Sequence, residues 1–246
     1  MTYCVAALTD QGIVFASDSR TNAGVDHLAT YSKMTVFDAP NDRVVVLLGA
    51  GNLASTQSVI SLLKLRMKSE QGEVNANGML GLRSLYDIAT LVGDTVREVI
   101  VRDGPSLTQQ NIDPGCTFIL GGQINGKSQR LFHIYPQGNF IESSVDTNFF
   151  QIGETKYGKP IIDRVVKYDT SLKDAAKCLL VSFNSTMRSN LSVGLPIDLL
   201  VYEKDALRVT LRRRFVEDDA YYAEIGRFWS KGLQRVFAEA PDVPWD

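Results

Sequence analysis

The sequence predicts an α+β fold of four layers, in which two β-sheets pack face to face and helices cover their outer sides. Apolar runs of strand length fall into groups, and helices with a single apolar stripe lie between and after these groups. The strands follow one another through short turns, without the regular strand–helix alternation of a parallel sheet. With 246 residues, 44% of them hydrophobic, the chain can bury a full core as one domain spanning residues 1–246.

The first elements are predicted to be strands. Residues 3–16 form a β-hairpin, because two apolar runs rich in β-branched and aromatic residues flank a turn at residues 9–12. A strand over residues 31–37 is expected to enter the same sheet. A buried strand over residues 43–51 ends in a glycine turn, and a helix over residues 52–67 follows it, because apolar residues recur there at helical spacing.

The remaining elements follow from the same two periodicities. Helices are expected over Gly81–Asp103, Tyr157–Tyr168, Ser171–Arg188 and Asp218–Glu239. Strands are expected over Cys116–Gly122, Gln129–Ile134, Phe140–Glu142, Leu195–Glu203 and Ala206–Arg213. Gly104 and Pro105 are expected to end the first of these helices, because proline lacks the N–H that would continue it. The tail over residues 241–246 is expected to be irregular.

Thr2 is the most informative candidate for a catalytic residue. Only Met1 precedes it, and an initiator methionine is commonly removed before a small second residue, so the mature chain is expected to begin with Thr2. An N-terminal threonine carries a hydroxyl nucleophile and an amine base on one residue. The dipeptide alone is a weak signal, because many ordinary chains begin in this way.

Two charged residues are predicted to converge on Thr2. The hairpin returns Asp18 to the start of the first strand, and Lys33 enters from a later strand. The Lys33 cation would lower the pKa of the Thr2 amine from its ordinary value of about 7.7–8.0, and Asp18 would hold Lys33 charged and in place. The alternative is that Asp18 belongs to a polar turn and that Lys33 is a solvated strand residue.

These positions resemble the β-subunits of proteasome-type peptidases, which are N-terminal-nucleophile hydrolases. The resemblance rests on Thr2, the Asp-x-Arg turn Asp18-Ser19-Arg20 and Lys33, at nearly the spacing of that family. Residues 2–6 and 15–24 are similar specifically to the bacterial branch called Anbu. The resemblance covers most of the chain, and it implies the N-terminal-nucleophile hydrolase fold and a ring or helical stack of identical subunits.

The resemblance also implies which glycine would stabilise an oxyanion. Gly51 is the best match to the glycine whose backbone N–H has this role in proteasome-type enzymes. A backbone N–H at a turn from a strand into a helix is also a preorganised donor on physical grounds, because the N-terminus of the helix aids it.

The supporting positions of the family are only partly kept. Arg20 matches the arginine of the turn. Ser192 matches the serine of an Asp-x-x-Ser-Gly-Gly motif, in which Ser189 replaces the aspartate. Many members of the family have a Gly-Ser-Gly motif whose serine contacts the amine of the N-terminal threonine. That serine is missing here. Gly153 is the nearest equivalent of the motif, and Glu154, or the threonine after it, could make the polar contact instead. Efficient peptide hydrolysis is therefore less firmly implied than the nucleophile.

Other chemistries have weaker support in the sequence. Residues 49–54 fit the G-x-G-x-x-A pattern of a dinucleotide-binding loop, which needs a strand ending in an acidic residue about 20 residues later. Glu70 stands near that distance, but in a predicted loop. His27 and His133 are far apart, and the three cysteines are scattered in apolar stretches where they are expected to be buried. No cofactor, metal site or disulfide framework is indicated.

Charge and hydropathy limit the partners. The net charge of −2 gives no electrostatic reason to expect nucleic acid. No apolar stretch approaches 18 residues, so no membrane partner is expected. The N-terminus lacks the layout of a secretion signal, so we expect a cytoplasmic location. The basic run Arg212–Arg214 is expected to be a solvated strand end or a contact between subunits.

We therefore expect a threonine-type N-terminal-nucleophile hydrolase that cleaves peptide amide bonds inside a homo-oligomer. Two alternatives stay open: a non-catalytic scaffold subunit of the same fold, and an amidase acting on a small-molecule or conjugate amide. Aromatic residues of the last helix are expected to anchor contacts between subunits, unless they belong to the core of one subunit. They are Tyr221, Tyr222, Phe228 and Trp229.

Overall fold

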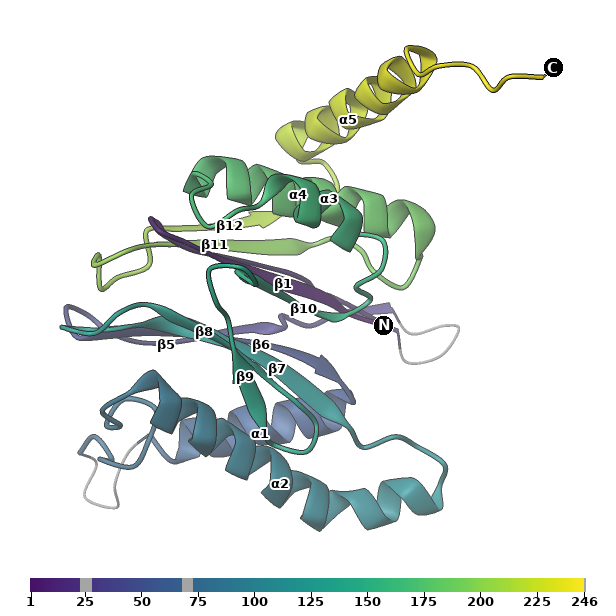
Figure 1. Cartoon of the computed structure of the whole chain (residues 1–246). Coiled ribbons are helices and arrows are strands. Elements are labelled where there is room, and N and C mark those ends of the chain that lie inside the picture. Colours follow the sequence, from purple (N-terminus) through teal and green to yellow (C-terminus); the bar gives the residue numbers. More distant parts are fainter. Residues whose placement is uncertain (23–27, 68–72, 246) are drawn as a thin grey trace.

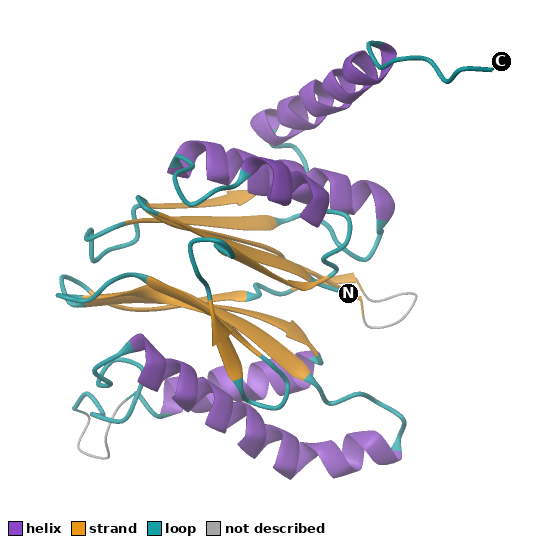
Figure 2. Ribbon diagram, in the orientation of Figure 1, coloured by secondary structure: helices purple, strands orange, loops and turns teal. Residues whose placement is uncertain are grey.

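The computed structural model describes residues 1–22, 28–67 and 73–245, and these form the four-layer sandwich of Figures 1 and 2. Two five-stranded sheets face each other, and helices cover the outer face of each sheet. The predicted α+β four-layer fold is confirmed. His27 and Glu70, and most of the loop predicted around Glu70, lie outside the described residues.

The first sheet has the strand order β10-β1-β2-β11-β12. Its strands are β1 (Tyr3–Thr9), β2 (Gly12–Asp18), β10 (Phe149–Gly153), β11 (Ile197–Glu203) and β12 (Leu211–Phe215). The predicted hairpin is confirmed, because β1 and β2 pair antiparallel with Cys4 opposite Ser17. Strand β10 was not predicted; it pairs with the other edge of β1 and places Gly153 opposite Tyr3.

The second sheet has the order β5-β6-β7-β8-β9. Its strands are β5 (Met34–Ala39), β6 (Arg43–Gly51), β7 (Cys116–Ile124), β8 (Arg130–Ile134) and β9 (Phe140–Glu142). The prediction that residues 31–37 join the sheet of the first hairpin is wrong: β5 pairs with β6, and Lys33 stands just before β5. Lys33 therefore reaches Asp18 from the opposite sheet.

A small antiparallel ladder is formed by β3 (Arg20–Asn22) and β4 (Leu28–Thr30).

The pairing of the strands excludes the dinucleotide-binding fold that residues 49–54 suggested as an alternative. Every strand pair within the described residues is antiparallel, including β6 with β7. A dinucleotide-binding fold requires a parallel sheet at this glycine-rich turn.

Five helices are found in the described residues. They are α1 (Leu53–Leu65), α2 (Leu85–Gln109), α3 (Lys159–Val165), α4 (Leu172–Ser189) and α5 (Ala220–Ala238). Helices α1 and α2 cover the second sheet, α3 and α4 cover the first, and α5 lies beyond α4 with its C-terminal end projecting from the body (Figure 1). Side-chain caps fix where four of them begin, at Asn52, Ser84, Ser171 and Asp219.

The long helix α2 differs from its predicted bounds at both ends. It begins at Leu85 rather than Gly81, because the Ser84 hydroxyl accepts the Asp87 N–H and caps the first turn. It continues through Pro105 to Gln109. Proline removes one helical hydrogen bond, to the carbonyl of Val101, and Val101 lies on the exposed side where water can replace that bond.

Two further boundaries differ from the prediction, the start of β12 and the end of α3. The hairpin β11–β12 has a longer turn than expected, and its second strand begins at Leu211 rather than Ala206. Asp205 and Leu207 take positive φ values of 64° and 48° in this turn, which a strand does not allow. Gln123 anchors the turn by accepting the Asp205 N–H at 2.8 Å. Helix α3 is shorter than predicted, because Val166 is already extended.

Three apolar clusters form the core, one between the sheets and one beneath each helical layer. All three cysteines are buried and unbonded to one another, as predicted. Among the described residues, no helix is long and apolar enough to cross a membrane.

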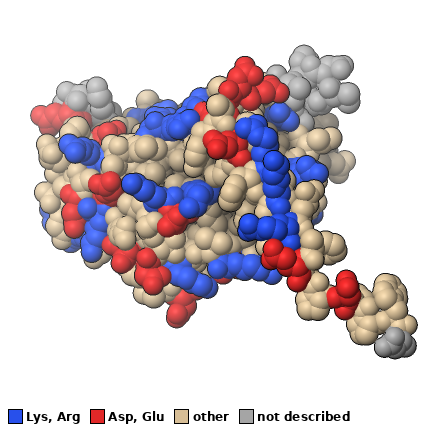
Figure 3. All heavy atoms as spheres, turned by 90° about the horizontal axis from the view of Figure 1, so that it is seen from above, with Lys and Arg blue, Asp and Glu red and all other residues tan. Residues whose placement is uncertain are grey.

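The aromatic residues of α5 were expected either to anchor contacts between subunits or to belong to the core of one subunit. Tyr222 is buried and packs 5.9 Å from Phe215, so it belongs to the core of this subunit. Phe228 is 77% exposed and Tyr221 is also exposed, so these two side chains are not core residues. The irregular tail from Pro241 to Trp245 is exposed, as Figure 3 also shows.

Candidate active site

The candidate site lies where β1 begins. Thr2 directly precedes β1 and is partly buried. Its carbonyl oxygen accepts the Glu154 N–H at 2.7 Å. Gly153 takes a φ of +82°, and a Cβ atom there would stand 2.0 Å from the same carbonyl oxygen. Glycine is therefore required at position 153 for the end of β10 to hold Thr2 this closely.

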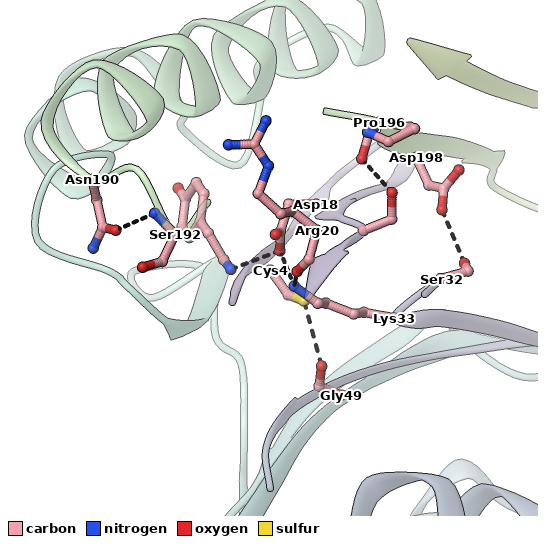
Figure 4. Close-up of polar contacts among 12 residues, drawn as sticks. Cys4, Asp18, Arg20, Ser32, Lys33, Gly49, Asn190, Ser192, Pro196 and Asp198 are labelled. Atoms are coloured by element: carbon pink, nitrogen blue, oxygen red, sulfur yellow. Dashed lines mark hydrogen bonds and ion pairs between the residues drawn. The ribbon is translucent and has the colours of Figure 1, made fainter. Parts of the chain in front are cut away.

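The expected convergence of charged residues is present. Asp18 is fully buried at the end of β2, and its Oδ1 accepts the Tyr3 N–H at 2.9 Å and Lys33 Nζ at 2.7 Å (Figure 4). Lys33 Nζ also donates to the Arg20 carbonyl at 2.8 Å, and its side chain is 6% exposed. One carboxylate oxygen thus joins Lys33 to the residue that follows Thr2.

Burial controls the ionisation of this cluster. Burial raises the pKa of the Asp18 carboxyl, whereas the Lys33 cation and the Tyr3 N–H act in the opposite direction. Burial also raises the pKa of the Cys4 thiol, and the nearby Asp18 carboxylate raises it further. Cys4 is therefore held as a neutral thiol, which is a poor nucleophile.

Gly51 stands at the last position of β6, opposite Cys116 on β7. It takes a φ of +110°, and a Cβ atom there would stand 2.4 Å from the Gly115 carbonyl oxygen. The Asn52 N–H donates to that same oxygen at 2.9 Å, and Asn52 caps the N-terminus of α1. The glycine turn therefore leads directly into the positive end of a helix dipole.

These residues border one cavity of about 460 Å³. Thr2, Lys33 and Gly51 all line it, and Met1 lies at the same place. Its apolar wall contains residues from the second sheet and α1. They are Ala50, Leu53, Ile60 and Phe118. The cavity therefore has an apolar wall on the side of the second sheet and α1, and polar groups around Thr2 and Lys33.

The supporting residues Arg20 and Ser192 meet where the Arg20 side chain reaches the loop after α4. Arg20 donates from Nη1 to the Leu191 carbonyl at 3.1 Å and packs against Gly194. Ser192 donates its backbone N–H to Asn190 Oδ1 at 2.9 Å (Figure 4). Ser189 is the exposed last residue of α4.

Asn190 was missed by the sequence reasoning. Its side-chain N–H donates to Glu154 Oε2 at 2.8 Å, and its Oδ1 accepts the Ser192 N–H. Asn190 thereby connects two of the supporting residues predicted from the motifs. An asparagine just after a helix gives no local signal for a partner 36 residues away in the chain.

The four-layer sandwich with a threonine at the start of β1 is the fold of the N-terminal-nucleophile hydrolases. Within that class, a protein-family model described as proteasome subunit matches residues 2–201. The chain belongs to the proteasome subunit family.

Within this family, the chain is similar to solved structures of Anbu proteins. The chain is 49% identical to Anbu, an ancestral β-subunit, from Yersinia bercovieri, with a TM-score of 0.91 over 99% of this chain and 100% of that one. It is 50% identical to the protein in the helical assembly of the Anbu complex from Pseudomonas aeruginosa, with a TM-score of 0.91 over 99% of this chain and 98% of that one. A curated relative, proteasome subunit beta 2 of Pyrobaculum calidifontis, is 26% identical over 83% of this chain and 90% of its own length.

Proposed function

We propose that this chain is a threonine-type N-terminal-nucleophile hydrolase that cleaves peptide amide bonds, with Thr2 as the nucleophile. The observation that carries the proposal is the Asp18 Oδ1 atom shared by the Tyr3 N–H and Lys33 Nζ, directly beside Thr2. Membership of the proteasome subunit family supports the same reaction.

In the proposed reaction, removal of Met1 first frees the α-amine of Thr2. The Lys33 cation lowers the pKa of this amine, so that the amine is neutral and basic at pH 7. The Thr2 hydroxyl oxygen attacks the amide carbonyl carbon, and the amine accepts the hydroxyl proton directly or through a water molecule. The proton then passes to the leaving nitrogen as the C–N bond breaks.

The second half of the reaction restores the enzyme. The Thr2 amine takes a proton from water as the water oxygen attacks the ester carbon. The bond between this carbon and the Thr2 hydroxyl oxygen then breaks, the carboxylic acid product leaves, and the amine returns the proton to the hydroxyl oxygen. Gly51 donates its backbone N–H to the oxyanion in both halves, where one such donor contributes a factor of about 100–1,000 in rate. Arg20, Glu154 and Ser192 hold the residues around Thr2, with Asn190 joining the last two.

The cavity beside Thr2 is the basis for the proposed substrate preference. Its apolar wall and volume of about 460 Å³ favour an apolar side chain next to the bond that is cleaved. No cofactor takes part in this scheme, because the amine and hydroxyl of one residue supply base and nucleophile.

Self-assembly in the cytoplasm completes the proposal, and the single domain of residues 1–246 is its unit. A relative of 50% identity is known in a helical assembly. Helix α5 carries exposed apolar side chains, Phe228, Leu233, Val236 and Phe237, and the tail carries Trp245, which is 91% exposed. Apolar surface of this kind is typical of contacts between subunits.

The direct test is hydrolysis of a peptide panel by the purified protein, together with its intact mass. We expect loss of Met1, cleavage after apolar residues, and loss of cleavage in Thr2→Ala. The matched variant Cys4→Ala removes a buried nucleophilic atom near the site and should keep the activity. Cleavage of small amides but not peptides would favour the amidase, and retention of Met1 without any cleavage would favour the scaffold subunit.

A further inference from the structure

A second ion pair lies beside the Asp18–Lys33 pair. Asp198 on β11 and Arg214 on β12 are opposite each other in the antiparallel ladder. Arg214 Nη1 lies 3.0 Å and 3.2 Å from the two carboxylate oxygens of Asp198. The Asp198 side chain is only 5% exposed, whereas that of Arg214 is 41% exposed.

The second pair is bonded to the segment that presents Lys33. Ser32 precedes Lys33, and its hydroxyl donates to Asp198 Oδ2 at 2.9 Å (Figure 4). The Gly49 N–H donates to the Lys33 carbonyl at 3.0 Å, which ties the same segment to the second sheet. The Ser32–Asp198 bond therefore sets how this segment sits against the first sheet, where Asp18 lies.

The second pair is also bonded to the residue after Asp18. Arg214 Nη2 donates to the Ser19 hydroxyl oxygen at 3.2 Å, and the Ser19 hydroxyl donates to the Pro196 carbonyl at 2.7 Å. In addition, the Tyr31 N–H donates to the Ser19 carbonyl at 2.8 Å. Each member of the Asp18–Lys33 pair thus has an adjacent serine that is bonded to the Asp198–Arg214 pair.

Packing alone does not account for a carboxylate at position 198. On the same face of β11, Leu200 and Tyr202 belong to the apolar cluster between the sheets. An apolar residue at 198 would continue that cluster and would avoid the cost of burying the Asp198 carboxylate. A buried carboxylate with several fixed hydrogen bonds instead favours one geometry.

We propose that Asp198 and Arg214 are positioning residues, whose ion pair sets the distance and orientation between Lys33 and Thr2 through Ser32 and Ser19. The inference extends the proposed function and rests on it for the catalytic consequence, but the placement of Lys33 is a separate claim. A displacement of about 1 Å at a catalytic group can lower a rate by roughly 100-fold.

The test uses three variants and a matched control in the full-length protein. Ser32→Ala removes the link to Lys33 without leaving a buried charge unpaired, and Asp198→Asn neutralises the carboxylate while keeping its shape. Arg214→Lys keeps the charge but loses the two-pronged contact with Asp198 and Ser19. The control is Arg212→Gln, because Arg212 is exposed on the same strand and has no ion pair within the described residues.

The first readout is the rate at which Lys33 reacts with an amine-labelling reagent, measured by mass spectrometry at pH 8. In the wild type, we expect Lys33 to be protected, because its side chain is 6% exposed and paired with Asp18. We expect labelling at least about threefold faster in Ser32→Ala and Asp198→Asn, a smaller increase in Arg214→Lys, and none in the control. Wild-type protection in both Ser32→Ala and Asp198→Asn would overturn the inference.

The second readout is the pKa of the Thr2 amine, from the pH dependence of its own labelling. The charged groups near this amine are Lys33 and Arg20 at the cavity, Asp18 beside Tyr3, and Glu154 at the end of β10. We expect the amine pKa to rise in Ser32→Ala towards the ordinary value of about 7.7–8.0, with kcat falling roughly tenfold and KM little changed.

The possible results distinguish a failure of this inference from a failure of the proposed function. Faster labelling of Lys33 in these variants, in a protein whose wild type cleaves no peptide, would support the positioning pair and overturn the proposed function. A lower melting temperature with unchanged Lys33 labelling and unchanged amine pKa would show a role in stability only, and would overturn the positioning role.

Discussion

At the scale of single residues, the proposed chemistry depends on a lysine that is paired with a fully buried carboxylate. Lys33 Nζ lies 2.7 Å from Asp18 Oδ1, and the Asp18 side chain has no exposed surface. The same oxygen accepts the Tyr3 N–H, so Asp18 fixes the backbone next to Thr2 as well as the cation. Changes at Lys33 are therefore expected to affect both folding and the ionisation of Thr2.

The residue-scale prediction concerns Lys33→Ala. Without the cation, the pKa of the Thr2 amine should rise, and turnover at pH 7 should fall by a factor of roughly 100–10,000, because a positioned base contributes about that much. Asp18→Asn should have the same effect more weakly. The pH–rate profile of each variant measures the change.

The control for this prediction is Lys173→Ala, which removes an exposed lysine from α4. Because Lys33→Ala leaves Asp18 buried without its partner, a loss of stability on the order of 3–5 kcal/mol is expected as well. Circular dichroism must therefore show folded protein before rates are compared. A pH–rate profile in folded Lys33→Ala that matches the wild type would rule out the relay.

At the scale of elements, strands β7 and β8 hold a partly buried histidine between them. His133 on β8 lies 3.0 Å through Nε2 from Thr117 Oγ1 on β7. The Thr117 hydroxyl donates to the Ile134 carbonyl at 2.7 Å, so it accepts from the His133 ring nitrogen. Burial lowers the pKa of His133 below its ordinary value.

The element-scale prediction follows from the sign of that shift. Below a pH of about 6.5 the unfolded chain binds a proton at His133 more readily than the folded chain, so stability falls as the pH falls through this range. His133→Gln keeps a hydrogen-bond donor but does not titrate. Urea unfolding at pH 7.5 and 5.5 should therefore show a smaller loss of stability in His133→Gln than in the wild type, and an equal loss would contradict the assignment.

At the scale of the whole molecule, the exposed apolar side of α5 is where we expect a contact with another copy of the chain. Phe228, Val236 and Phe237 are all exposed on this helix, and its C-terminal end projects from the body. On the face shown in Figure 3, positive and negative side chains are interspersed. Contact between copies of the chain would thus draw mainly on apolar burial.

The whole-molecule prediction is a homo-oligomer of at least six subunits, with the tail 241–246 on its surface. Phe228→Asp with Phe237→Asp should lower the subunit number at micromolar concentration, because loss of an aromatic anchor costs about 2 kcal/mol or more. Native mass spectrometry measures this. The matched control Val145→Asp changes an exposed apolar residue in the loop between β9 and β10. A wild-type monomer at micromolar concentration would refute the assembly and favour the amidase.

The sequence was sufficient to predict the fold wherever local pattern and tertiary packing agree. The first hairpin and the bounds Arg43–Gly51 of β6 are cases of this kind. Helix α2 is a counter-example, because Pro105 normally indicates a helix end, yet the packed stripe of α2 holds it in a continuous helix. Strand β10 was missed because its short sequence is defined by pairing with β1, almost 150 residues earlier in the chain.

The residues of the candidate site also fall into those that the sequence predicts and those that it does not. Thr2, Asp18 and Lys33 could be predicted because one hairpin and a known spacing bring them together. Asp198 and Arg214 could not, because Asp198 contacts Ser32 across 166 residues and Arg214 contacts Ser19 across 195. In the sequence, these two residues look like an isolated acid and part of a basic run.

The most direct test of the account is to locate the residue that reacts with an electrophile directed at N-terminal threonines, such as a peptide epoxyketone. Tandem mass spectrometry of the labelled protein should place the adduct on Thr2, in a chain that lacks Met1, and Thr2→Ala should be unlabelled and inactive. An adduct on Cys4 or on a serine, with Thr2→Ala still active, would contradict the claim that Thr2 is the nucleophile.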